Sequence, residues 1–321
     1  MKEVIILLGP TGAGKTAASL LLARALHTEI ISADSMQIYR HMDIGTAKPT
    51  REELARIRHH MIDIVEPWES YSTGRYIEEV TPIISALHMR NAIPLIVGGT
   101  GLYIKALTRG IFSGPSADKA LRDALLQKEK ADAGALYRQL QAVDPRAAES
   151  ITPADLRRTV RALEVFLSGN KKMSEMQTEH TEKLPFDFIK IGLTRDRKEL
   201  YGMIDRRVDD MFAMGLVDEV KNVLQLISSE ARRQGNAEIR ESELSSLQAI
   251  GYKELLRHLR GELSLPDAVA LIKQRSRNYA KRQFTWFRKE EGIRWIDITG
   301  ITDTEVIFER IEAAIGNTDG I

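Results

Sequence analysis

Residues 9–16 have the types and spacing of a loop that binds phosphate. They read Gly9-Pro10-Thr11-Gly12-Ala13-Gly14-Lys15-Thr16, which fits the pattern G-x-x-x-x-G-K-[ST]. The segment lies between an apolar run typical of a buried strand (Val4–Leu8) and a run with helical spacing (Thr16–Leu26). Backbone N–H groups and the helix N-terminus attract an anion there. We expect Lys15 to neutralise the outer phosphate and the Thr16 hydroxyl to ligate Mg²⁺.

This phosphate loop does not identify the phosphate compound. A nucleotide hydrolase or kinase usually adds an apolar strand that ends in an Asp for the metal ion. Here the apolar strand Ile93–Val97 is followed by Gly98-Gly99. The absence of that carboxylate counts against an ordinary ATPase.

A carboxylate, Asp34, follows the short strand predicted over Glu29–Ser32. A side chain at the carboxyl end of a strand beside the phosphate loop points into the crevice where ligands bind. Asp34 could therefore ligate a metal ion through water or accept a proton. Alternatively, it could cap a helix over Met36–Tyr39. The residues alone leave both interpretations open.

The order of these elements predicts the fold class. Residues 4–32 form one βαβ unit, and the helical stretch Tyr76–Arg90 leads into the strand Ile93–Val97. We expect an α/β fold with a parallel-sheet core of the P-loop NTPase type, flanked by helices.

One long segment interrupts the α/β pattern. We expect residues 116–184 to form an all-helical insertion between core segments 1–115 and 185–321, with Lys171–Lys183 as a loop. The polar stretch Gln225–Glu243 is also predicted to be a loop.

Composition restricts the possible functions. The chain of 321 residues has no cysteine, which excludes disulfides, zinc fingers, iron–sulfur ligation and thiol catalysis. Its net charge is +1, yet residues 268–289 carry seven Lys or Arg and no acid, so this stripe could bind phosphates. Val4–Leu8 is too short to span a bilayer and no signal-peptide pattern follows. We therefore expect a cytoplasmic protein with no membrane partner.

The basic stripe reads as one helix, Ala268–Lys289. Arg277, Lys281 and Arg288 share one side of it, and Phe284, Trp286 and Phe287 are interleaved with them. Basic groups can grip RNA phosphates while aromatic rings stack on exposed bases. The alternative is a surface helix whose aromatic side chains face the core.

Segments spread over the chain together resemble the tRNA dimethylallyltransferases. The matching segments are Gly9–Thr16, Ile31–Tyr39, Met42–Pro49, Val97–Tyr103, Arg161–Val165 and Lys281–Arg288. The resemblance implies transfer of a dimethylallyl group from dimethylallyl diphosphate to the exocyclic amine of the adenosine 3′ to the anticodon in tRNA. Mg²⁺ would assist, Asp34 would be the general base, and the enzyme would act as a monomer.

The resemblance also implies roles for individual residues. The diphosphate would bind residues 9–16, with Mg²⁺ on Thr16. The catalytic set would be Thr11, Asp34, Thr100 and Arg207, with Arg206 as a competing choice for Arg207. The residues implied to contact the tRNA anticodon stem-loop are Asp34, Ser35, Met36, Gln37, Thr100, Arg122, Arg157, Arg158, Arg161, Gln248, Gly251, Tyr252, Lys253, Lys281, Arg282, Gln283, Thr285, Trp286 and Arg288.

This function requires the target adenine to leave its stack and to enter a channel that meets the diphosphate site. The insertion would close over the anticodon stem as a clamp. Two other hypotheses fit the phosphate loop: a small-molecule kinase with a helical lid, and an RNA-binding module without catalysis.

Overall fold

The computed structural model describes residues 2–112, 114–115, 118–169, 171–179, 181–235 and 244–316. The chain forms two compact units. The core unit comprises Met1–Lys105 and Pro185–Ile321, and the inserted unit comprises Ala106–Leu184. The inserted unit begins before the expected residue 116, because strand β5 (Ile111–Phe112) pairs with strand β6 (Thr181–Glu182) where the chain enters and leaves it.

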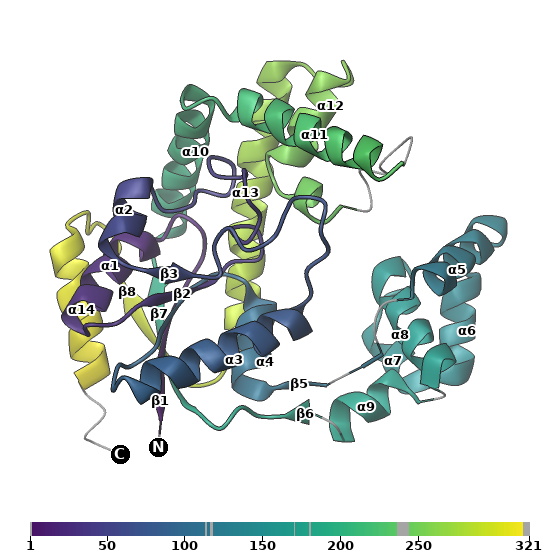
Figure 1. Ribbon diagram of the computed structural model, residues 1–321, viewed down its shortest axis with the longest axis horizontal. Helices are drawn as coiled ribbons and strands as arrows, with labels where there is room; N and C mark the ends of the chain where they lie inside the picture. The colour runs from purple at the N-terminus through teal and green to yellow at the C-terminus, as the bar shows by residue number, and fades with distance from the viewer. Residues whose placement is uncertain are drawn as a thin grey trace. The chain divides into compact units, whose positions relative to one another are not determined.

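The core unit is built on a parallel sheet, whose described strands follow the order β3-β2-β4-β1-β7-β8 (Figure 1). The order places the phosphate loop, which follows β1, near the middle of the sheet, where ligands of such folds bind beyond the strand ends. The predicted parallel α/β core is confirmed. The strands are β1 Glu3–Leu8, β2 Ile30–Ala33, β3 His59–His60, β4 Leu95–Gly98, β7 Asp187–Thr194 and β8 Ile293–Asp297.

Helices bury the apolar side chains of this sheet. Ile5 and Leu7 of β1 share a hydrophobic cluster with α1 (Lys15–Ala25) and α14 (Thr304–Gly316). Helices α3 (Thr73–Met89) and α4 (Gly101–Arg109) meet through the stacked rings of Tyr76 and Tyr103, whose centroids are 3.9 Å apart. The Tyr76 hydroxyl donates to the carbonyl of Ser32 on β2, 3.1 Å away, which fixes α3 against the sheet.

A second hydrophobic cluster joins four later helices to the chain segment that follows β2. These helices are α10 (Arg197–Ala213), α11 (Leu216–Arg233), α12 (Tyr252–Leu259) and α13 (Leu265–Phe287). In Figure 1 they gather to one side of the sheet. The loop predicted over Gln225–Glu243 is wrong for its first part, because residues up to Arg233 continue the amphipathic helix α11; residues 236–243 lie outside the described ranges.

The described part of the inserted unit is mostly helical. Its helices are α5 (Lys119–Ala131), α6 (Ala135–Val143), α7 (Pro145–Ser150), α8 (Leu156–Gly169) and α9 (Met173–Glu179). The prediction of a loop over Lys171–Lys183 is wrong at α9. The backbone N–H and the hydroxyl of Ser174 donate to the carboxylate of Asp144 at 3.0 and 2.7 Å, which holds the first turn of α9 against α7.

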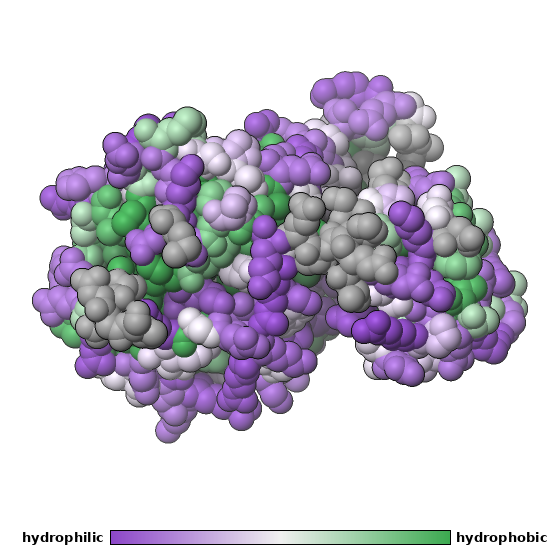
Figure 2. Space-filling view, turned by 90° about the horizontal axis from the view of Figure 1, so that it is seen from below, coloured by the Kyte–Doolittle hydropathy of each residue, from purple (hydrophilic) through white to green (hydrophobic). Residues whose placement is uncertain are grey.

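The core unit also has two short helices: α2 (Arg51–Arg56), which begins at a capping box formed by Thr50 and Glu53, and a single 3-10 turn, η2 (Ser246–Gln248). Across the described ranges, every helix is too short or too polar to cross a membrane. The face of the molecule in Figure 2 is largely hydrophilic, with smaller hydrophobic areas.

We predict that Gly98→Ala destabilises the core unit. A Cβ at residue 98 would lie 2.3 Å from the carbonyl oxygen of Ala33 on the neighbouring strand, so β2 and β4 would have to separate. We expect the free energy of unfolding, measured with urea, to fall by about 1–3 kcal/mol. The control is Gly202→Ala on α10, where the nearest atom would be 3.6 Å away. Equal stability of the two variants would contradict the prediction.

Candidate functional site

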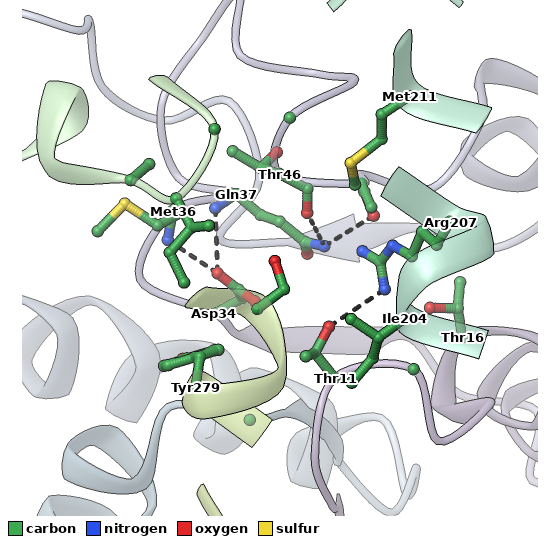
Figure 3. Close-up of a pocket in the computed structure, with 18 of the residues that line it drawn as sticks. Thr11, Thr16, Asp34, Met36, Gln37, Thr46, Ile204, Arg207, Met211 and Tyr279 are labelled. Atoms are coloured by element: carbon green, nitrogen blue, oxygen red, sulfur yellow. Dashed lines mark hydrogen bonds between the residues drawn. The ribbon is translucent and has the colours of Figure 1, made fainter. Parts of the chain in front are cut away.

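A cavity of about 650 Å³ lies within the core unit, where the phosphate loop and the ends of β2 and β4 face α10 and α13. Figure 3 shows side chains from these separate segments pointing toward one another. The cavity therefore gathers many of the residues singled out from the sequence. Those that line it are Thr11, Gly12, Gly14, Lys15, Thr16, Asp34, Ser35, Met36, Gln37, Arg207, Gln248, Gly251, Arg282 and Gln283.

The phosphate loop depends on glycine at its tightest points. Gly14 has φ of 84°, a conformation that L side chains rarely adopt, and it immediately precedes α1. A Cβ at Gly9 would lie 2.7 Å from the carbonyl oxygen of Leu193 on β7. Gly9, Pro10 and Ala13 belong to the loop but do not line the cavity, and Ala13 is buried in the core.

Two cations meet at the phosphate-loop end of the cavity. The Lys15 ammonium donates to the carbonyl of Pro10 at 2.8 Å, and the Arg207 guanidinium donates to the Thr11 hydroxyl at 3.3 Å. Arg206 is exposed and does not line the cavity. Of the two arginines left open by the sequence, the structure therefore directs Arg207 into the cavity.

Burial makes these cations costly without an anion. Burial, with a contribution from neighbouring Arg207, lowers the pKa of Lys15 to about 8. Burial also lowers the pKa of Arg207, while the Asp34 carboxylate acts in the opposite direction on both residues. A bound anion would favour the charged form of both groups, so this end of the cavity suits a diphosphate.

Asp34 both caps the chain segment that follows it and faces the cavity. One of its oxygens accepts from the backbone N–H groups of Met36 and Gln37, at 2.8 and 3.4 Å, and Asp34 also lines the cavity (Figure 3). The segment that follows is a turn and not the alternative helix over Met36–Tyr39. The capping bonds fix the direction of the carboxylate without removing it from the cavity.

Thr100 and Gln283 tie backbone segments together. The Thr100 hydroxyl accepts from the N–H of Ser35 at 3.0 Å and does not line the cavity. The buried amide of Gln283 accepts from the N–H of Thr11 at 2.8 Å and donates to the carbonyl of Gly99 at 2.9 Å. Both the oxygen and the NH₂ group of this amide are hydrogen-bonded to protein backbone, although Gln283 was expected to contact RNA.

Two neighbouring residues of the expected RNA contacts have opposite environments. Tyr252 is fully buried in the cluster around α11 and α12, and its hydroxyl donates to a carboxylate oxygen of Glu219. Its expected role as an RNA contact is wrong for this arrangement, because the ring has no exposed surface. Lys253, the next residue, is exposed.

The end of α13 exposes most of the residues that were expected to face RNA. Phe287 is buried and Phe284 packs against Trp295, so the interpretation that aromatic residues face the core is confirmed for these two. Trp286 is 41% exposed. Arg277 is held in an ion pair with Asp205 at 2.5 Å. The exposed members of the expected set are Lys281, Arg282, Thr285, Trp286 and Arg288.

In the inserted unit, a buried carboxylate organises two of the four expected arginines. Glu164 is fully buried and accepts from Arg122 at 2.8 and 2.9 Å and from Arg161 at 2.5 Å. These hydrogen bonds keep the pKa of Glu164 below its usual value despite the opposing effect of burial. Arg157 and Arg158 are exposed on the same helix, α8.

Sequence reasoning missed two features of the cavity. The first is Tyr279, a lining residue whose pKa is raised by burial and by the charge of Asp34, so that its phenol stays protonated. Its position four residues before Gln283 on α13 could have revealed it. The second is an apolar wall, for which the sequence gives no local signal: Ala47, Ile204, Val208, Met211, Leu216, Ile250 and Ile272.

Family models match most of the chain. A model described as IPP transferase matches residues 37–290, and one described as isopentenyl transferase matches residues 2–66. The tRNA dimethylallyltransferase of Thermodesulfovibrio yellowstonii is 54% identical, and the match covers 98% of each chain. That of Syntrophobacter fumaroxidans is 46% identical over 96% of this chain and 86% of the relative.

Solved structures agree with these matches. The tRNA isopentenylpyrophosphate transferase of Bacillus halodurans is 38% identical, with a TM-score of 0.68, and the match covers 99% of this chain and 98% of the other. A eukaryotic dimethylallyltransferase acting on tRNA is 32% identical, with a TM-score of 0.82, over 99% of this chain and 79% of the other.

We predict that the affinity for inorganic diphosphate falls as pH rises above the pKa of Lys15. The lysine loses its charge there, so the dissociation constant should rise by up to about tenfold per pH unit between about pH 8 and pH 9.5. Isothermal titration calorimetry would measure it. In the Lys15→Arg control the charge at residue 15 persists over this pH range. Inorganic diphosphate itself ionises in the same way with both proteins, so its titration cancels when the two pH profiles are compared. Identical pH profiles for both proteins would contradict the assignment.

Proposed function

The chain belongs to the IPP transferase family, and we propose that it transfers the dimethylallyl group of dimethylallyl diphosphate to the N6 amine of the adenosine 3′ to the anticodon in tRNA. The observation that carries this proposal is a single cavity with three different parts. These are a cationic end at the phosphate loop, a carboxylate at Asp34 and an apolar wall.

The cationic end suits the diphosphate. The backbone of the phosphate loop and the N-terminus of α1 attract the anion. Lys15 and Arg207 draw negative charge from it as it leaves, and Thr11, which Arg207 contacts, lies beside it. The hydrogen bond from the Thr11 N–H to the Gln283 side chain holds the phosphate loop in its conformation before substrate binds.

The apolar wall suits the five-carbon group. Val208, Met211 and Leu216 lie beyond Arg207 along α10 and at the start of α11, and they line the same cavity. An allylic group against apolar side chains is shielded from water while the bond to oxygen breaks. This shielding matters because the allylic carbon carries positive charge at that moment and would otherwise react with water.

Asp34 completes the reaction. The carbon–oxygen bond to the diphosphate breaks, and the diphosphate leaves with the electron pair. The N6 nitrogen forms the new bond to the allylic carbon and gives a proton to the free carboxylate oxygen of Asp34. The N6 amine is a poor nucleophile because its lone pair is delocalised into the ring, so removal of this proton as the bond forms assists the attack.

The donor set at the phosphate loop fits Mg²⁺. The Thr16 hydroxyl and the Asp34 carboxylate line one cavity, and the described residues include no group of three or more His, Asp or Glu that could hold a metal ion. Proteins commonly bind Mg²⁺ through one or two such oxygens together with substrate phosphates and water. Thr16 would hold the ion, which supplies charge neutralisation to the leaving diphosphate when bound.

RNA recognition would use both units of a monomer. The exposed Lys281, Arg282 and Arg288 of α13 and the arginines of α8 provide positive charge for the phosphates of the anticodon stem-loop. Trp286 offers an exposed ring for stacking. The test of the whole proposal is incubation with labelled dimethylallyl diphosphate and an anticodon stem-loop RNA; absence of label on the RNA would overturn it.

We predict that Asp34→Asn slows prenyl transfer by roughly 10²–10⁴-fold, the usual contribution of a positioned base. The asparagine oxygen can still accept from the N–H groups of Met36 and Gln37, so the turn should persist. Single-turnover assays would measure the rate, and a filter-binding assay should give an RNA dissociation constant within about threefold of the wild type. Asp132→Asn, at an exposed ion pair, is the control. Wild-type rates for Asp34→Asn would exclude it as the base.

We predict that Lys281→Ala weakens binding to the anticodon stem-loop. The slope of log affinity against log salt concentration should become shallower by roughly one, which corresponds to one fewer counterion released. The lysine is exposed at the end of α13, so its removal should leave stability unchanged. The measurement is the dissociation constant as a function of KCl concentration. Lys221→Ala, which removes an exposed lysine of α11 paired with Asp218, is the control. Parallel salt slopes for wild type and Lys281→Ala would remove α13 from the RNA interface.

A further inference from the structure

The segment Met42–Lys48, here called the wall loop, forms part of the cavity, and Gly45, Thr46 and Ala47 line it. The resemblance of the sequence to a known family depends strongly on this segment, yet only Ala47, a member of the apolar wall, has a role in the reaction proposed above. The wall loop has no helix or strand. It is a turn closed by hydrogen bonds from the N–H of Ala47 to the carbonyl of Ile44 and from the N–H of Lys48 to the carbonyl of Asp43, and side chains from elsewhere attach this turn to the rest of the core unit.

A single carboxylate holds the first half of the wall loop. Glu219 accepts from the backbone N–H groups of Asp43 at 2.8 Å, Ile44 at 2.7 Å and Gly45 at 2.9 Å. Its position in the first turn of α11 further favours a negative charge. Three successive N–H groups directed at one carboxylate fix the local backbone far more tightly than a single hydrogen bond.

Tyr252 supplies the fourth donor to Glu219 and a surface for the loop. Its hydroxyl donates to the Glu219 oxygen that also accepts from Gly45. Burial and the Glu219 charge raise the pKa of Tyr252, so the hydroxyl remains a donor. A Cβ at Gly45 would lie 2.5 Å from the Tyr252 ring and 2.9 Å from Leu216, so only glycine allows the loop to pack this closely.

The second half of the wall loop connects to the catalytic carboxylate. The Gln37 amide donates to the carbonyls of Thr46 and Ala47 at 3.4 and 3.2 Å, and the Gln37 backbone N–H donates to Asp34. Figure 3 shows Gln37 between Asp34 and Thr46. A continuous set of hydrogen bonds therefore leads from Glu219 through the wall loop to Asp34.

We propose that Glu219 is a positioning residue that fixes the wall loop and thereby limits the length of prenyl group that the cavity accepts. This inference rests on the proposed function, since it concerns the tail of the same donor. Ala47 of the wall loop and Met211 of α10 are apolar members of the lining, and displacement of the loop would enlarge the space available to the tail.

The test compares two prenyl donors in the full-length enzyme. In Glu219→Gln, one acceptor oxygen becomes an NH₂ group that faces backbone N–H donors, so the wall loop should be released. The ratio of kcat/KM for geranyl diphosphate to that for dimethylallyl diphosphate should rise about tenfold, which is the discrimination a well-formed apolar pocket provides. The KM for dimethylallyl diphosphate should rise more than kcat falls, and affinity for the anticodon stem-loop should stay unchanged.

Two further variants serve as a control and as an independent test. Glu230→Gln, on the same helix but paired with Arg233, should behave as wild type. Tyr252→Phe removes one donor to Glu219 and keeps the ring, so it should change the donor ratio in the same direction, by less; it also serves if Glu219→Gln does not fold. An unchanged donor ratio in these variants would overturn the proposal.

Hydrogen exchange separates this proposal from the proposed function. The backbone amides of residues 43–45 should exchange faster in Glu219→Gln than in wild type, whatever reaction the enzyme catalyses. Unchanged protection would overturn the role of Glu219, even with full prenyl transfer. If the wild-type enzyme transferred no prenyl group while the variant still exchanged faster, the proposed function and the limit on prenyl length would both be overturned. The anchoring of the wall loop by Glu219 would then still stand.

Discussion

Two cations, Lys15 and Arg207, lie partly buried beside one carboxylate, Asp34, in the cavity of the core unit. This arrangement is costly in the free protein, because burial disfavours charge and the two cations repel each other. The surrounding structure must therefore prevent the side chains from turning toward solvent. The sheet fixes the phosphate loop at the end of β1 and Asp34 at the end of β2, on either side of β4, and α10 brings Arg207 to them from more than 170 residues later in the chain.

The same kind of contact recurs around the cavity. In each case a polar side chain from an element distant in the sequence forms hydrogen bonds with the backbone of a loop. Gln283 holds the phosphate loop to the end of β4, Thr100 holds the N–H of Ser35, and Glu219 holds the wall loop. Each contact satisfies loop backbone groups that are not paired within a helix or strand. A rigid cavity can thus be built from loops, which is what positioning an unreactive amine against an allylic carbon requires.

Positive charge on the exposed surfaces is also organised by carboxylates. Glu164 holds Arg122 and Arg161 in the inserted unit, whereas Asp205 holds Arg277 on α13. An arginine held in this way loses less side-chain entropy when it binds phosphate. Counting basic residues along a helix therefore overestimates the accessible charge; for the RNA contact proposed above, the exposed Lys281, Arg282 and Arg288 offer the more accessible charges.

The sequence by itself determined the phosphate loop, the parallel core and the place of Asp34, because local patterns encode them: glycine spacing, apolar strands and a carboxylate after a strand. It singled out Arg207 only by resemblance, with Arg206 as a competing choice, and it assigned buried Tyr252 to the surface. Tertiary structure alone decided these points, as it decided the contacts of Glu219 and Gln283 and the apolar wall. The physical reason is that burial and hydrogen bonding between residues far apart in the chain leave no trace in local spacing.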